Sequence, residues 1–82
     1  MASVSVTAGT PQDLVQNANK NLTVTVDLTG DGFHVYYHII RAGSIVQSGK
    51  AIAGIQSVVS VLKNDTVNAE PCGTGTIIVL AV

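Results

Sequence analysis

Two histidines spaced four residues apart, His34 and His38, are the first side chains that could do chemistry. On a helix they could share a zinc ion. Residues 33–42 alternate apolar and polar instead, which predicts a strand, and on a strand the two imidazoles share a face but lie about 13 Å apart. We therefore predict no metal site. With Tyr36 and Ile40 they form a stripe that is either an interface, a ligand platform or an ordinary half-exposed face.

If that stripe lies in an interface, its contacts should weaken near pH 6, where histidine gains charge. Elsewhere the chemistry is sparse. Cys72 lies between Pro71 and Gly73 with no histidine nearby in the sequence to act as its base. Residues 27–32 resemble part of a calcium loop, but the position that needs a glutamate is His38. We predict no catalytic residues, no cofactor and no enzyme activity.

The composition indicates a protein that works through contacts. Apolar residues make up 46% of the 82 residues and charged residues only 11%, against a usual charged share of about 25%. A chain this short has a small core and usually needs disulfides, a metal or partner subunits. A single cysteine excludes internal disulfides. Oligomerisation or docking is the remaining route.

The charges exclude other partners. The formal net charge is −1, and the four basic residues are scattered singly, so no basic patch for nucleic acid is expected. The longest apolar run, residues 77–82, is far too short to span a bilayer. The first residues lack the basic and apolar regions of a signal peptide, so we expect either a protein that is made in the cytoplasm and used without secretion or a chain that has been processed.

Period-two alternation dominates the chain and predicts its strands. In residues 21–28, one face is apolar and the other is mostly threonine. About seven short strands are expected, over residues 3–8, 21–28, 33–42, 45–48, 55–62, 66–70 and 76–82. Residues 12–21 are predicted to be a loop, Ser48 to Lys50 a turn, and Pro71 the end of a strand. The fold class is all-β, in a single domain over residues 1–82.

The last strand is apolar on both faces and must be covered on both. It is either the central strand of a tight sandwich or a strand whose outer face docks on a neighbouring subunit. Both explanations stay open at this point.

The strand-like segments 21–28 and 75–82 resemble those of a small immunoglobulin-like antiparallel β-sandwich, although the cysteine pair and core tryptophan of antibody domains are absent. Length, neutral composition and the start of the chain are similar to those of the decoration, or cement, proteins of tailed-phage capsids. The resemblance implies a virion protein that stabilises a lattice in many copies, often as trimers. Its partners would be itself and a major shell protein.

The residues expected to make those contacts are the stripe on strand 33–42 and the two chain ends, namely His34, Tyr36, His38, Ile40, Val4, Val6 and Val82. The alternative is an immunoglobulin-like adhesion or carbohydrate-binding module that uses Tyr36, Tyr37 and polar groups in the turns. Sugar sites usually present aromatic platforms, and the chain has no Trp, two Tyr and one Phe.

Overall fold

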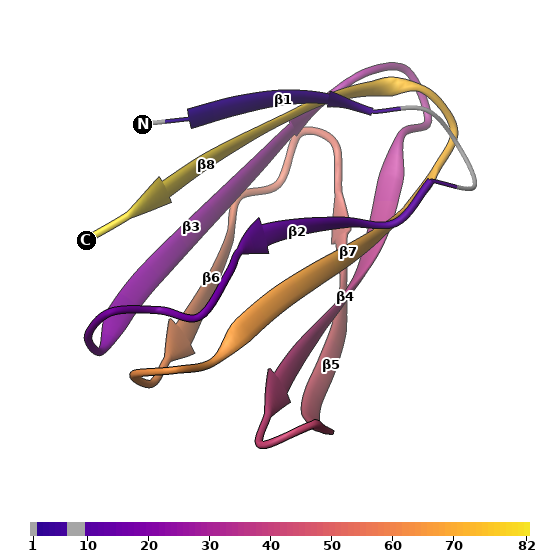
Figure 1. Ribbon diagram of the computed structural model, residues 1–82. Helices are drawn as coiled ribbons and strands as arrows, with labels where there is room; N and C mark the ends of the chain where they lie inside the picture. The colour runs from indigo at the N-terminus through magenta and orange to yellow at the C-terminus, as the bar shows by residue number, and fades with distance from the viewer. Residues whose placement is uncertain (1, 7–9) are drawn as a thin grey trace.

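The computed structural model describes residues 2–6, for which only the backbone is considered, and residues 10–82. This part of the chain forms two antiparallel sheets packed as a sandwich (Figure 1). The eight strands are β1 (Ala2–Val6), β2 (Gln12–Val15), β3 (Leu22–Thr29), β4 (His34–Arg41), β5 (Ser44–Ile52), β6 (Ser57–Val61), β7 (Thr66–Cys72) and β8 (Gly75–Ala81). The predicted all-β antiparallel sandwich is confirmed.

The strands pair from the outside of the chain inwards, the first with the last, and this gives the fold its topology. Strand β1 pairs with β8, β2 with β7, β3 with β6, and β4 with β5, as in one long hairpin whose two arms run side by side. Folding of that hairpin adds the β3–β8 and β4–β7 pairs. The result is sheet I, in the order β1-β8-β3-β6, and sheet II, in the order β2-β7-β4-β5. Two sheets made from a rolled eight-stranded hairpin form a jelly roll.

This topology places the closing strand differently from an immunoglobulin constant-type sandwich. There the last strand shares a sheet with strands C and F. Here β8 lies between β1 and β3 in the other sheet. Strand β8 is therefore internal to sheet I, and Ile77 and Val79 point into the core, while Leu80 on the outer face is exposed.

The core lies between the sheets and consists of the inward-facing residues of both. Alternation along β3 buries Val24, Val26 and Leu28, as predicted, and Val35 and Ile39 of β4 face them from sheet II. The whole buried apolar set is Ala18, Val24, Val26, Leu28, Phe33, Val35, Ile39, Ala51, Val59, Val61, Val67, Ala69, Ile77 and Val79. Small and β-branched residues dominate it, which suits two twisted sheets at close separation.

The predicted turn at Ser48 to Lys50 is wrong, because β5 continues through it. Gly49 pairs with Tyr37 of β4, and a Cβ atom at Gly49 would collide with the ring of Tyr37. The glycine therefore allows the tyrosine to lie across the strand. A sequence pattern cannot separate this use of glycine from a turn.

Two other expectations are also corrected. Part of the predicted loop 12–21 is strand β2; a register shift between Asp13 and Val15 hides its alternation. Pro71 does not end its strand, since β7 reaches Cys72. The described pairing of β2 with β7 stops at Ala69. Beyond Ala69, the edge of β7 that faces away from β4 has no described strand to bond. Proline, which has no backbone N–H to donate, is tolerated at such an edge.

One buried carboxylate ties three connections together. The Asp65 side chain is fully buried, and it accepts hydrogen bonds from Arg41 Nε at 2.9 Å, Arg41 Nη2 at 2.8 Å and the Leu62 amide at 3.0 Å. Its backbone carbonyl accepts from the Ala18 amide at 2.9 Å, and the Ala18 carbonyl accepts from the Asn64 amide at 2.7 Å. The end of β4, the segment after β2 and the β6–β7 turn are thereby joined.

The Arg41 hydrogen bonds lower the pKa of the Asp65 carboxyl against the opposing effect of burial, and the Leu62 amide lowers it further. A folded-state pKa below the unfolded one adds stability that is present above the unfolded value, about 3.9, and is lost as the pH falls through the folded value. We predict that Asp65→Asn removes this acid-dependent part and leaves Arg41 without its bidentate partner. Denaturant midpoints measured from pH 7 to pH 2 would show it.

The matched control is Asp31→Asn, which also removes one carboxylate but from an exposed turn. At pH 7 the midpoint of Asp31→Asn should stay close to the wild-type value, whereas that of Asp65→Asn should be clearly lower. Equal midpoints for the two variants would contradict the role given to Asp65.

A second prediction concerns Gly49. Substitution Gly49→Ala should lower the free energy of unfolding by about 1–3 kcal/mol, because the new Cβ overpacks against the Tyr37 ring. In a Tyr37→Leu background the same substitution should cost much less. Urea denaturation of the four chains of this double-mutant cycle would measure the coupling, and additive effects would refute the proposed contact.

Candidate functional site

The outer face of sheet II carries the stripe predicted from the sequence. His34, Tyr36, His38 and Ile40 alternate along β4 with the inward-facing Val35, Tyr37 and Ile39. All four are partly or well exposed, and Tyr36 shows 42% of its surface. The structure therefore places these four residues together on one solvent-facing side, and their role as an interface stays a prediction.

Tyr36 lies at the centre of a row that crosses three strands. Its register partners are Lys50 on β5 and Glu70 on β7. The Lys50 Nζ atom lies over the tyrosine ring, 5.8 Å from its centroid, and the His34 ring meets it edge-on at 5.7 Å between centroids. The tyrosine ring is thus held by its neighbours, with a cation on one side and a carboxylate on the other.

The next row is built on His38. Its cross-strand partners are Ser48 and Asn68, and Asp13 of β2 pairs with Asn68 in turn. His38 Nδ1 is 2.9 Å from the Ser48 hydroxyl oxygen, and the Asn68 side-chain amide donates to Asp13 Oδ1 at 2.9 Å. His38 Nε2 is 3.8 Å from Glu70 Oε1, which links the two rows.

Charge is divided across this face. Among the described residues, the two acids that point outward, Asp13 and Glu70, belong to β2 and β7. The base, Lys50, belongs to β5 on the other side of β4. The face is therefore acidic towards one edge and basic towards the other, with Tyr36 between them.

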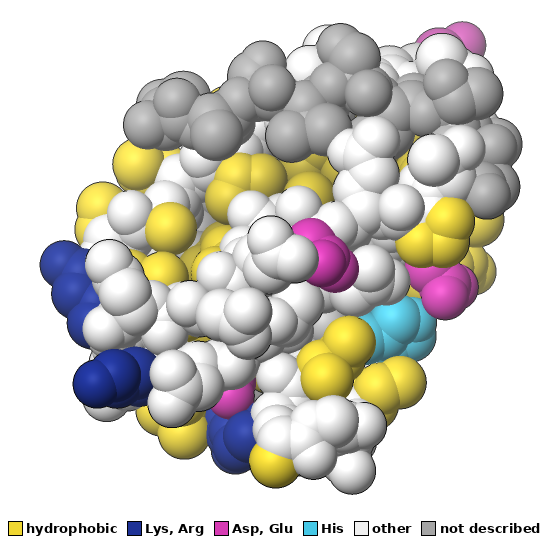
Figure 2. Space-filling model, viewed as in Figure 1, with side chains coloured by type: hydrophobic (Ala, Val, Ile, Leu, Met, Phe, Trp, Pro, Cys, Tyr) yellow, Lys and Arg dark blue, Asp and Glu magenta, His cyan; other side chains and the backbone are white. Residues whose placement is uncertain are grey.

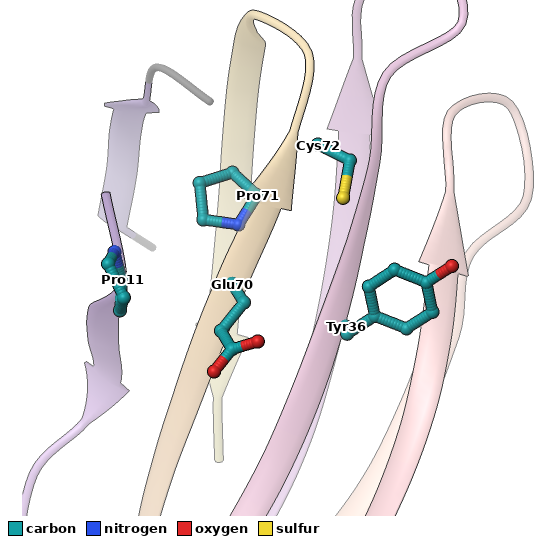
Figure 3. Close-up of a pocket in the computed structure, with 5 residues that line it drawn as sticks. All are labelled: Pro11, Tyr36, Glu70, Pro71 and Cys72. Carbon is teal, nitrogen blue, oxygen red and sulfur yellow. The ribbon is translucent and has the colours of Figure 1, made fainter. Parts of the chain in front are cut away.

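A shallow pocket opens beside Tyr36 (Figure 3). It is lined by Pro11, Tyr36, Glu70, Pro71 and Cys72. Its volume of about 230 Å³ is below the roughly 300–1,000 Å³ of usual small-molecule sites. The register sets His34 opposite Cys72, a proximity that the sequence order does not reveal. No hydrogen bond joins those two side chains in the described structure, so the pair lacks the contact that an activated nucleophile needs.

The outer face of sheet I also carries exposed apolar side chains. Val58, Thr25 and Leu80 form one cross-strand row, and Val58 and Leu80 are 59% and 37% exposed. Val82, also exposed, exchanges backbone hydrogen bonds with Thr23. Val4 and Val6 were predicted to make contacts; the β1 backbone pairs with β8, but these two side chains lie outside the described residues.

The described part of the chain lacks two further kinds of feature. No group of three or more His, Cys, Asp or Glu side chains is placed to hold a metal ion. No helix there is long and apolar enough to cross a membrane.

Comparison with known proteins found no matching family model, no similar curated protein and no similar solved structure.

The pocket geometry predicts the reactivity of Cys72. Because its half-buried thiol lines a solvent-open pocket next to Tyr36, iodoacetamide should alkylate the folded protein slowly. Tyr36→Ala should raise that rate several-fold by widening the pocket, and mass spectrometry would follow the reaction, with Cys72→Ser as the unreactive control. An identical rate for the wild type and Tyr36→Ala would mean that the tyrosine does not shield the thiol.

Proposed function

We propose that the protein is a non-enzymatic structural protein that stabilises a many-copy lattice, such as a virion capsid, through contacts of its sheet faces. The single observation that carries the proposal is the exposure of apolar side chains on the outer faces of both sheets. Val58 and Leu80 lie on one, and Tyr36, Ile45 and Ile52 on the other. Val58 and Leu80 flank Thr25 in one cross-strand row, and exposed apolar side chains of this kind are what an association would bury.

The shortage of surface charge agrees with this proposal. The accessible surface of 4577 Å² is close to the roughly 4,600 Å² expected of a compact chain of this mass, so the surface to be solvated is of ordinary size. The chain has only nine Lys, Arg, Asp and Glu residues to make this surface charged, and one of them, Asp65, is buried against Arg41. On the side seen in Figure 2, hydrophobic side chains lie among uncharged polar ones, with no broad field of one charge.

The topology is compatible with the same proposal. Jelly rolls recur in viral capsid and lectin domains. A fold alone does not determine function, so this likeness supports a lattice role only alongside the exposed faces. A decoration or cement protein, held on a shell by copies of itself and by the shell protein, is the form that we favour.

A second candidate is an adhesion or carbohydrate-binding module. The observation that favours it is the pocket beside Tyr36, where an exposed aromatic ring stands next to the carboxylate of Glu70. A sugar could stack on the ring and donate hydroxyl hydrogen bonds to the carboxylate. Against it, Lys50 and His34 already contact that ring.

The two candidates predict different masses in solution. For a lattice protein, light scattering at micromolar to millimolar concentrations should show a reversible rise in mass towards dimers, trimers or larger assemblies. Part of the rise should persist in high salt, because apolar burial is not screened whereas ion pairs across a contact are weakened. A monomer at every concentration that binds a soluble sugar, with binding lost in Tyr36→Ala, would favour the second candidate.

A further inference from the structure

The charges on the outer face of sheet II are arranged so that this face complements a copy of itself. Lys50, Tyr36 and Glu70 occupy one row, with the tyrosine in the middle. Neighbouring strands are about 4.8 Å apart, so the opposite charges originate at equal distances on either side of β4. The Lys50 ammonium leans over the Tyr36 ring, which brings its charge towards the middle of the face.

We propose that two copies of the chain associate through this face. A two-fold axis that lies between the copies, parallel to β4, relates them. The axis exchanges the two sides of the row, so Tyr36 meets Tyr36 of the second copy, and each Lys50 meets Glu70 of the other copy. A two-fold contact uses the same patch twice and must be self-complementary, which this row satisfies. The inference rests on the proposed function, because it names one of the faces that would build the lattice.

Charge also selects the direction of the axis. An axis across the strands through Tyr36 would set Lys50 on Lys50 and Glu70 on Glu70, and like charges in contact disfavour association. An axis along β4 sets each base on an acid. Stacked sheets cross at about 30°, and the central row tolerates this angle because its members lie close to the axis.

The remaining rows agree with the same axis. It places Ile52 over Cys72 of the second copy, Ser48 over Asn68, and Ile45 over Thr66, as the cross-strand partners of β4 dictate. Groups of β5 and β7 that meet around the central ion pairs are therefore apolar or uncharged polar, His34 and His38 of β4 meet their own counterparts, and no two acids or two lysines meet. Tyr36 stays 42% exposed beside Lys50 and His34, so the aromatic pair at the centre has free surface to act as the kind of anchor that interfaces concentrate.

A sheet face of this molecule has room for such a contact. The chain measures 33 × 23 × 17 Å along its principal axes. The area of its broad side is therefore close to the roughly 800 Å² that each partner buries in a standard interface. An axis parallel to β4 sets β7, β4 and β5 against β5, β4 and β7 of the second copy, and β2, the fourth strand of sheet II, lies beside the contact.

The test uses two charge-reversal variants, Lys50→Glu and Glu70→Lys, measured by sedimentation equilibrium. In either variant alone, both symmetry-related pairs become like-charged, so dimerisation should weaken by roughly tenfold or more. In an equimolar mixture, Glu at position 50 of one chain faces Lys at position 70 of the other, and the remaining pair is the native one. The mixture should therefore recover a one-to-one dimer of near wild-type affinity.

Matched controls change the same charge away from the face. Lys63→Glu and Asp31→Lys lie on exposed turn positions and should leave dimerisation unchanged, and circular dichroism should show that all variants stay folded. Recovery in the mixture would support the inference. If both single variants associate like the wild type, the inference fails while the lattice proposal stands on another face. A wild-type chain that stays monomeric overturns the inference and the self-association behind it.

Discussion

The burial of a single carboxylate between connections that are distant in the sequence constrains the whole sandwich. Asp65 is removed from water and satisfied by the forked guanidinium of Arg41 and by the Leu62 amide. Arg41 keeps 44% of its side chain exposed, but without it Asp65 would be an unpaired buried charge, which is strongly unfavourable. The pair therefore specifies one arrangement: the end of β4 must meet the β6–β7 turn, and the segment after β2 must close over both. Sheet II and the loop between the sheets are fixed together at this point.

Much of the fold follows from local alternation, and those parts were predictable. The two faces of β3, the Gly-Asp turn after it and the two faces of β4 depend on neighbours within the same strand. The misread parts depend on residues far away in the sequence. Strand β2 depends on its ladder to β7, and the glycine at position 49 is needed because of the ring of Tyr37. Pro71 is tolerated within β7 because the ladder to β2 stops at Ala69. Asp65 reads as an ordinary turn residue until its partner, 24 positions earlier, is known.

The candidate interaction surface divides in the same way. Strand geometry placed His34, Tyr36, His38 and Ile40 on one face, because period two needs no knowledge of other strands. Lys50 and Glu70 could not be added to them, since the register that sets both beside Tyr36 belongs to the three-dimensional pairing. The division of charge across the face, with acids on β2 and β7 and the base on β5, is a property of strand order alone.

The position of β8 also bears on how the protein is made. It is the last strand in the chain, yet it lies between β1 and β3, two of the first three. While the chain is being synthesised, β1 and β3 leave the ribosome well before the strand that joins them, and sheet I has an open slot for most of that time. Folding is then governed by contacts between residues that are far apart in sequence, which are slow to form. A second chain nearby could offer its own apolar strand to that slot, so a copy whose β8 has not yet paired is open to strand exchange.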